Sequence, residues 1–347
     1  MISYDYIMVG CGLAGIAFIE KLKANNKSFL VFDDASQKSS VVAAGLYNPV
    51  ALKRFNKVWK STEQLDLALP MYAKIESDLN IQIDYKLKIL RRFSSTEEQN
   101  LWYEASGKPG LKEYMSSDIV RYKSPNIKSE HHFGEVLQAG RIDTETLIKA
   151  YRKELLANNQ LKPEKFKYEE IEISGDSVKY QDVNTKNMVF AEGFGVKQNP
   201  FFRKVELNGT KGELITIKAP KLNIDFAIKS SVFVIPLGND LYKVGSTYNR
   251  VDKTNTTTEA AKNELITKLK SFMTCDFEVV EHSAGVRPTT KDRRPLVGSH
   301  HSLDNVYILN GLGTRGVMIA PYVAEKLYKL IEYSEDLDPE IDVNRFS

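Results

Sequence analysis

The sequence predicts a mixed α/β fold, in which a Rossmann-like domain is assembled from discontinuous segments and an antiparallel-sheet domain is inserted. Three observations predict it: a strand–glycine turn–helix–strand unit opens the chain, strand-rich segments lie in its middle, and a second strand–glycine turn–helix element follows near its end. We expect residues 1–84, 136–202 and 284–347 to form the Rossmann-like domain. Residues 85–135 and 203–283 then form the inserted domain, which we expect to bind the substrate.

The opening unit carries three glycines at the spacing Gly-x-Gly-x-x-Gly. An apolar strand, Tyr6–Val9, runs directly into Gly10, Gly12 and Gly15, and a helix with apolar residues on one face follows. The first glycine permits a tight turn, the second lets the backbone approach a pyrophosphate, and the third lets the helix pack closely on the strand. The free N–H groups and the positive dipole end of that helix would face the phosphates.

An acidic residue completes this unit. The second strand, Ser28–Phe32, ends in Asp33, where a carboxylate accepts hydrogen bonds from the ribose hydroxyls of adenosine. A glycine-rich turn alone is a weak signal, but the turn, both strands, the helix and the acid together predict a bound dinucleotide. We therefore assign dinucleotide binding to Gly10, Cys11, Gly12, Leu13, Ala14, Gly15, Asp33 and Asp34.

The composition is that of an ordinary globular protein. Of 347 residues, 42% are hydrophobic and 27% charged, and the 48 basic and 45 acidic residues leave a net charge of +3, which by itself predicts no nucleic-acid partner. Two cysteines, Cys11 and Cys275, provide neither a disulfide framework nor a metal cluster and suit a reducing compartment. The opening residues lack the basic segment of a cleavable signal, and no apolar run approaches the length of a membrane span. We therefore expect a cytoplasmic protein.

The pattern that follows the opening unit is less regular. Residues 39–49 are rich in small residues and are predicted to form a loop. Apolar residues at helical spacing predict a helix over 61–80 and another after Asp143. Residues 85–135 are mixed and polar, with a strand-like run at Leu87–Phe93. This mixture marks the first part of the inserted domain.

Strand patterns dominate from residue 166 to residue 250. The expected strands are Phe166–Ile173, Ser177–Tyr180, Asn187–Ala191, Leu214–Ile217, Val232–Ile235 and Leu241–Val244. Residues 238–240, Gly-Asn-Asp, predict a hairpin loop. A capping box formed by Thr256 and Glu259 predicts a helix that continues to about Met273.

The second glycine turn lies near the end of the chain. An apolar strand, Val306–Leu309, leads into the turn Gly311–Gly316, and a long helix, Val317–Tyr333, follows. The start of that helix would stabilise negative charge on an electron-rich group. A simple helix cap in a buried turn is the alternative explanation.

An arginine upstream of this turn is a candidate for binding a carboxylate. Arg287 ends a strand of small and apolar residues, and Pro288 terminates that strand. The guanidinium group is a planar fork that matches a carboxylate. The alternative is a surface or ion-paired arginine.

The histidines and basic segments offer weaker candidates. Four of the five histidines form adjacent pairs at 131–132 and 300–301 in polar segments, and neighbours do not share one face, so we predict no metal site. The basic segments 162–167 and 291–294 are either solvated surface or contacts to an RNA backbone.

Together these residues resemble the D-amino-acid-oxidase-like family of FAD-dependent oxidoreductases, which includes glycine and sarcosine oxidases. The resemblance covers nearly the whole chain, and the motifs occur in the order of the family. The stretch 285–298, which contains Arg287, resembles the most specific signature of the family. The other similar stretches are 10–15 with Asp33, 43–46, 140–143, 189–193, 211–214, 244–247 and 311–316.

The resemblance implies an enzyme that binds FAD non-covalently, because the cysteine that links FAD in sarcosine oxidases has no counterpart near Arg287. It implies oxidation of a C–N bond in an amine or amino acid by hydride transfer to flavin N5, followed by hydrolysis of the imine. Arg287 would be the catalytic residue that holds the substrate carboxylate. The further cofactor-binding residues that it implies are Ala43, Ala44, Gly45, Leu46, Glu192, Gly193, Gly311, Leu312, Gly313, Thr314, Arg315, Gly316, Val317 and Met318.

The implied substrate-binding residues are Arg287, Phe233, Tyr248 and Arg315, and two positions depart from the family. Phe233 stands where glycine oxidases have a tyrosine. Thr314 stands where they have a second arginine, whereas Arg315 follows one place later. The identity of the substrate therefore stays open.

Within the family, residues 45–49, 245–250, 293–298 and 314–321 resemble the FAD half of the bifunctional bacterial enzymes that make 5-methylaminomethyl-2-thiouridine in tRNA. Three functions stay open: oxidation of a small amine or amino acid, removal of a carboxymethyl group from carboxymethylaminomethyl-uridine in tRNA, and flavin binding without turnover. A dehydrogenase that uses NAD alone leaves the second glycine turn unexplained. The electron acceptor and the oligomeric state also stay open.

Overall fold

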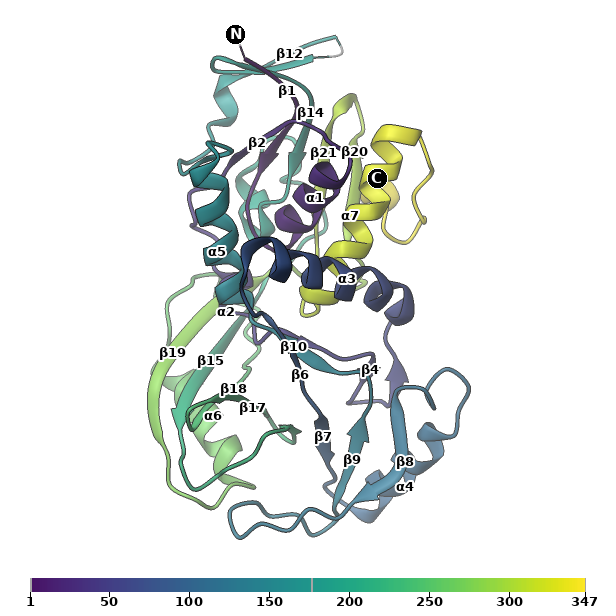
Figure 1. Cartoon of the computed structure of the whole chain (residues 1–347), viewed down its shortest axis with the longest axis vertical. Coiled ribbons are helices and arrows are strands. Elements are labelled where there is room, and N and C mark those ends of the chain that lie inside the picture. Colours follow the sequence, from purple (N-terminus) through teal and green to yellow (C-terminus); the bar gives the residue numbers. More distant parts are fainter. Residues whose placement is uncertain (1, 176, 347) are drawn as a thin grey trace.

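The computed structural model describes residues 2–175 and 177–346, and two eight-stranded sheets occupy the upper and lower halves of Figure 1. The first sheet contains β1 (Ile2–Val9), β2 (Phe29–Phe32), β11 (Leu161–Lys162), β12 (Ile171–Ser174), β13 (Ser177–Tyr180), β14 (Val183–Phe190), β20 (Leu296–His300) and β21 (Leu303–Asn310). The second contains β7 (Ile89–Arg92), β8 (Met115–Val120), β9 (Phe133–Val136), β15 (Thr210–Lys218), β16 (Ala227–Lys229), β17 (Phe233–Gly238), β18 (Leu241–Gly245) and β19 (Glu278–Arg287). Two smaller sheets contain β3 (Leu46–Tyr47), β6 (Asp84–Lys86) and β10 (Gly140–Ile142), and β4 (Val50–Ala51) and β5 (Asn56–Lys57).

The centre of the first sheet is parallel, with the strand order β2-β1-β14-β21. Successive residues of β1 point to opposite faces, and both faces are covered: Tyr6 and Met8 pack among helices, whereas Ile7 and Val9 pack in an aromatic-rich cluster. The helices are α1 (Leu13–Ala24), α3 (Ser61–Leu79), α5 (Thr144–Ala157) and α7 (Gly316–Tyr333). This arrangement confirms the Rossmann-like fold.

The second sheet has the order β19-β15-β18-β17-β16-β7-β9-β8, and all its pairs except β16 with β7 are antiparallel. Val234 and Val244 pack against α6 (Glu259–Lys270) on one face. We call the other face, to which Phe233 and its neighbour Gly245 belong, the inner face. Phe233 packs there in a cluster that also includes Ala44 and Leu46, and α4 (Thr96–Ser106) covers the far end of this face.

Several expected elements are confirmed. The helix over 61–80 is α3, and the helix after Asp143 is α5, whose first turn the Asp143 side chain caps. The residues 238–240 join β17 to β18 in an antiparallel hairpin, and all three have left-handed φ angles. The strand Val306–Leu309 lies within β21, and the long final helix is α7.

Three local predictions are wrong. The loop predicted over 39–49 begins with a short helix, α2 (Ser39–Val42), and contains β3. The strand predicted over Phe166–Ile173 includes the 3₁₀ turn η1 (Tyr168–Glu170), because Phe166 is buried by stacking on Tyr180 at 4.2 Å between ring centroids rather than by strand pairing. The apolar residues of this segment are therefore buried by aromatic contacts and not by pairing in a strand.

The capping box is the third error. Thr258, not Thr256, caps α6, and its Oγ1 accepts a hydrogen bond from the N–H of Ala261 at 3.3 Å. The backbone N–H of Thr258 donates to the carboxylate of Glu213 on β15 at 2.8 Å, and this tertiary contact selects the helix start. The helix ends at Lys270 rather than at Met273.

The domain boundaries stay a prediction. β19 of the second sheet crosses the predicted boundary at residue 283 and continues to Arg287. Among the described residues, no helix combines the length and apolar character that crossing a membrane requires. Cys11 and Cys275 are free thiols, and Cys11 is buried in the first glycine turn.

Candidate active site

Two helix N-termini meet beside the first sheet. α1 begins after the first glycine turn and α7 after the second, and a Cβ on Gly316 would lie 3.1 Å from the side chain of Leu13. Neither N-cap residue, Gly12 or Arg315, supplies a side-chain cap. Figure 1 shows α1 and α7 side by side on the first sheet. The paired N-termini form a positive pole that favours phosphate and other anionic groups.

The first turn requires its glycines for steric reasons. Gly10 has a φ of +106°, and a Cβ there would lie 2.5 Å from the carbonyl oxygen of Ala191. A Cβ on Gly15 would overlap the carbonyl oxygen of Gly10. Gly12 faces the hydroxyl of Ser40, 3.0 Å from where its Cβ would be. We call this turn the glycine cradle: its backbone leaves no space for side chains at Gly10 and Gly15, and such turns let a pyrophosphate approach the backbone N–H groups.

Asp33 braces this turn. Its Oδ2 accepts a hydrogen bond from the N–H of Cys11 at 2.6 Å, and its Oδ1 accepts one from the N–H of Ala35 at 2.8 Å. Arg152, from α5, forms an ion pair with the same carboxylate. The carboxylate is therefore fixed at the end of β2. Arg152 was not predicted, because nothing in the local pattern links it to a residue 119 positions away.

Ser40 is a second site residue that the sequence reasoning missed. Its Oγ accepts a hydrogen bond from the N–H of Leu13, the first residue of α1, at 3.2 Å. The neighbouring Ser39 packs on β19, where a Cβ on Gly285 would lie 3.0 Å from its Cα. The segment therefore runs from the first glycine turn to the second sheet. The pair of serines just before Ala43 was the available signal.

Four predicted cofactor residues, Gly10, Asp33, Asp34 and Glu192, surround one cavity at the end of β1 and β2. Tyr168, Lys165, Gln37 and Gln198 complete much of its polar lining. The cavity lies at the carboxyl ends of parallel strands, where nucleotides bind in open α/β sheets. Together with the glycine cradle, it fits the adenosine end of FAD.

Glu192 is a buried acid in this cavity. Burial raises its pKa to about 7, although hydrogen bonds from the amide of Asn199 at 2.7 Å and from the phenol of Tyr168 act in the opposite direction. The charge of Asp34 adds to the rise. The protein therefore holds a proton on Glu192 at mildly acidic pH, where a solvated glutamate has lost it.

The Glu192→Gln variant is expected to change how stability depends on pH. Because the folded pKa is raised, the wild type is relatively stable below pH 4.5 and loses on the order of 3 kcal/mol, relative to the variant, as pH rises to 7. Urea unfolding of both FAD-free proteins from pH 4.5 to 8 measures this difference. Glu172→Gln, an exposed change on β12, is the control. A difference that stays flat across this range would refute the expectation.

The second glycine turn is hydrogen-bonded to the segment after Glu192 and to the segment after Arg287. Gly311 and Gly313 have φ angles of +73° and +60°. The side-chain amide of Asn310 donates to the carbonyl of Gly193 at 2.9 Å, and the N–H of Gly313 donates to the carbonyl of Pro288 at 3.0 Å. The predicted residues Leu312, Val317 and Met318 are buried, and Thr314 is exposed. The turn thus connects the adenosine cavity with the strand end that carries Arg287.

Arg287 lies over the inner face of the second sheet. Its guanidinium occupies the space above Gly212, donates to the hydroxyl of Ser246 at 2.7 Å and to the carbonyl of Thr247 at 3.4 Å, and lies 4.8 Å from the ring centroid of Tyr248. Burial lowers its pKa from the ordinary value. Within the described part of the chain it forms no ion pair with a carboxylate.

Arg315 joins this group. Burial lowers its pKa, and its neighbours include the phenol of Tyr248 and the charge of Arg293. Of the two predicted arginines, Arg287 lies against the ring of Tyr248, which remains 67% exposed, and Arg315 lies within the electrostatic reach of the same phenol. Thr314, which we expected to stand in the place of the second arginine of glycine oxidases, is exposed to solvent. Phe233 lies farther away, opposite Gly245 on the inner face.

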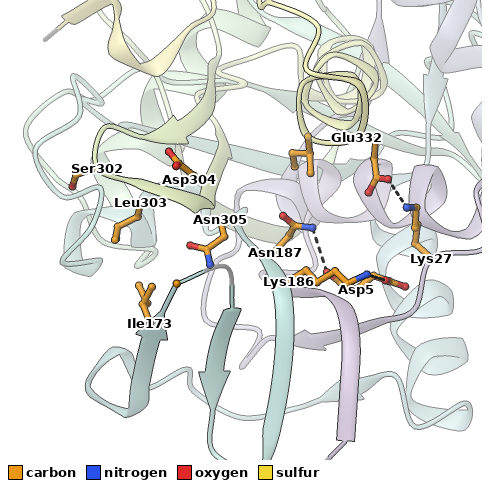
Figure 2. A pocket seen from close by; sticks show the side chains of 12 residues that line it. Asp5, Lys27, Ile173, Lys186, Asn187, Ser302, Leu303, Asp304, Asn305 and Glu332 are labelled. Carbon is orange, nitrogen blue, oxygen red and sulfur yellow. Dashed lines mark hydrogen bonds and ion pairs between the residues drawn. The ribbon is translucent and has the colours of Figure 1, made fainter.

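A second cavity lies elsewhere in the molecule. Figure 2 shows its lining, which includes Asp5, the ion pair of Lys27 with Glu332, and Asn305. None of the predicted site residues lines it. It lies near the starts of β2 and β21, away from the carboxyl strand ends where ligands bind in such sheets. Residues 2–175 and 177–346 contain no group of three or more His, Cys, Asp or Glu side chains that could hold a metal ion.

Comparison with known proteins shows the family to which the chain belongs. The family described as FAD dependent oxidoreductase, DAO, matches residues 5–330. Glycine oxidase of Bacillus subtilis (strain 168) is 22% identical over 367 residues, covering 96% of this chain and 94% of that protein. The crystal structure of glycine oxidase from Geobacillus kaustophilus has a TM-score of 0.82 at 18% identity and covers 100% of this chain and 98% of that chain, which shows a shared fold.

Other relatives are longer. The tRNA 5-methylaminomethyl-2-thiouridine biosynthesis bifunctional protein MnmC of Campylobacter jejuni subsp. doylei (strain ATCC BAA-1458 / RM4099 / 269.97) is 18% identical over 304 residues, which cover 84% of this chain and 45% of that protein. The chain thus spans less than half the length of this relative. Because the family match extends over nearly all of the sequence, the chain belongs to the DAO family of FAD-dependent oxidoreductases.

Proposed function

We propose that this FAD-dependent oxidoreductase oxidises the C–N bond of an amino acid or N-substituted amino acid whose carboxylate Arg287 holds. The observation that carries the proposal is the guanidinium of Arg287, which Ser246, Thr247 and Tyr248 hold in place while no carboxylate of the described residues pairs with it. Arg315, within the electrostatic reach of the same tyrosine, has no carboxylate partner among the described residues either. Buried charges are normally paired. Two such arginines at one site favour a substrate that supplies the anion.

Bound FAD supplies the two-electron acceptor that this oxidation needs. The glycine cradle, Ser40 and Asp33 would hold its pyrophosphate and ribose without a covalent link, and the cavity beside Glu192 would hold its adenosine. The amino end of α7, starting at Gly316, would add a positive dipole beside the reacting end. The two ends of the cofactor are therefore held by elements some 300 residues apart in the chain.

The protein's own contribution is orientation and charge. Ser246 and Thr247 fix the guanidinium of Arg287, so that a carboxylate bound in two-point fashion cannot rotate. The substrate must react as the neutral amine, and two nearby positive charges lower the pKa of a bound ammonium group. Oxidation removes a hydride from the carbon of the neutral amine and leaves a protonated imine, which water hydrolyses. This sequence of events requires no side-chain base.

Anaerobic titration tests the proposal. Purified protein supplemented with FAD is mixed with glycine, sarcosine or D-alanine, and in parallel with methylamine and dimethylamine, which lack the carboxylate. We expect the flavin absorbance to bleach with at least one of the first three and with neither of the last two. Flavin that binds but bleaches with none of the amino acids would contradict small-substrate oxidation and support the tRNA function or binding without turnover.

A specific observation favours tRNA as a second candidate substrate. The ring of Tyr248 is 67% exposed while its other face contacts Arg287, and the exposed Arg250 follows two residues later. An exposed aromatic ring beside arginines is a platform on which an unstacked base can lie. Removal of a carboxymethyl group from carboxymethylaminomethyl-uridine would use the same arginine for the same carboxylate. Bleaching by tRNA that carries this nucleoside, but not by unmodified tRNA, tests this candidate.

A further inference from the structure

One row of side chains crosses the inner face of the second sheet. The register pairs Leu214 with Gly245, Gly245 with Phe233, Phe233 with Lys229, and Lys229 with Arg91. Residues paired in this way project from the same face of a sheet. Lys229 and Arg91 therefore lie on the face that carries Phe233, one and two strands beyond it.

The two cations of this row differ in their partners. Arg91 is fully engaged: its Nε donates to Glu98 at 2.8 Å, and its Nη1 donates to the carbonyls of Lys229 at 3.4 Å and Ser230 at 3.2 Å. Lys229 is half-buried, and its Nζ lies 4.7 Å from the ring centroid of Phe233. Over the described residues it forms no ion pair. Lys229 is thus the free cation of the row.

The surroundings of Lys229 disfavour its charge. Burial, together with the neighbouring charges of Arg91 and Lys268, lowers its pKa to about 8. At neutral pH the amine is still predominantly protonated, and a bound anion would restore the lost stabilisation. Glu98 serves Arg91, and Glu264 forms an ion pair with Lys268. The natural partner for this charge is a group that the protein does not itself supply.

We infer that Lys229 is a specificity-determining residue that binds a second anionic group, a carboxylate or phosphate, at the far end of the substrate. The inference rests on the proposed function, in which Arg287 holds the first carboxylate. The guanidinium of Arg287 lies over Gly212 on β15, and the Nζ of Lys229 lies beside the ring of Phe233 on β17, two strands away. Two strand spacings amount to about 10 Å. The preferred substrate is accordingly longer than glycine or sarcosine, which would occupy only the Arg287 end of the site: it is an N-substituted amino acid with an anion at the end of its substituent.

Ligands that cannot be oxidised test this inference separately from catalysis. The series succinate, glutarate, adipate, pimelate and suberate moves two carboxylates apart by one methylene at a time, and each monoamide replaces the distal charge with a neutral group of similar size. Dissociation constants come from perturbation of the flavin spectrum of the FAD-loaded enzyme. In the wild type we expect one of the longer diacids to bind about tenfold more tightly than its monoamide, as one charge-assisted hydrogen bond supplies.

The variants decide which residue is responsible. Lys229→Met should bring the diacid and monoamide within twofold of each other and leave monoamide binding unchanged, and Lys229→Arg should restore the preference. Lys221→Met, an exposed change, is the matched control and should retain it. Provided that the monoamides bind, either of two results would overturn the inference. One is a wild type that does not prefer the diacid over its monoamide at any length, and the other is a preference for the diacid that survives Lys229→Met. If no carboxylate of either kind binds, the proposed function itself fails, and the inference fails with it.

Discussion

Replacing Arg287 with leucine is expected to lower kcat/KM for a carboxylate-bearing amine about a thousandfold, while FAD binding stays intact. Arg287 would make two charge-assisted hydrogen bonds to the carboxylate, and each bond of that kind contributes about 1.5–3 kcal/mol. Its contacts are to Ser246, Thr247 and Tyr248, none of which lines the adenosine cavity. The measurement is steady-state kinetics together with the flavin spectrum of the purified variant.

Arg287→Lys is the matched control, because it keeps the charge and loses the planar fork. We expect the kcat/KM of this variant to lie between those of Arg287→Leu and the wild type. A substrate whose carboxylate has been replaced by an amide should be affected little by either change. Equal losses for the acid and the amide would mean that Arg287 acts on the structure of the site rather than on the carboxylate.

Gly15→Ala is the second change with a large expected effect. The added Cβ would overlap the carbonyl oxygen of Gly10, which is backbone and has no rotamer to escape into. The start of α1 must therefore move away from β1. Losing one charge-assisted hydrogen bond from its N–H groups to the pyrophosphate costs about 1.5–3 kcal/mol, or about a hundredfold in affinity. We expect FAD affinity to fall by about that factor, measured by titration of the FAD-free protein with FAD.

Gly107→Ala provides the comparison for this change. Gly107 has a φ of −82°, and a Cβ there would lie 3.8 Å from the nearest atom, the carbonyl oxygen of Glu104. The substitution adds the same methyl group at the end of α4, where it meets no obstacle. The variant should bind FAD like the wild type. A Gly15→Ala protein with unchanged FAD affinity would show that the cradle is more pliable than the structure indicates.

The parts of the site that were predicted from the sequence are those that depend on neighbours in the chain. Gly10, Gly12 and Gly15 form one turn with one helix, so their spacing alone carries the information. The same holds for Gly311 and Gly313. Arg287 was a candidate because of its place at the end of a strand, and the family resemblance added Arg315. The structure places the guanidinium of Arg287 4.8 Å from the ring centroid of Tyr248.

The residues that were missed depend on contacts between distant segments. Ser40 reaches the start of α1 across 27 positions, and Arg152 reaches Asp33 across 119. Lys229 became notable only once the strand register placed it beside Phe233. The error at Thr258 has the same origin, since a carboxylate 45 positions away selects the helix cap. The periodicity of apolar residues along the chain reflects local structure and carries no information about such contacts.

The scattered origin of the first sheet has a consequence for a chain that is still being synthesised. β14 pairs with β1 as soon as both exist, but its other neighbour, β21, starts only at Leu303. Until then the carboxyl half of β14 is an open edge, and open edges invite pairing with other chains. Before Gly316 and α7 have been synthesised, the protein could bind FAD only at its adenosine end. Loading of the cofactor therefore belongs after translation, and β21 protects the nascent chain from aggregation before it supports catalysis.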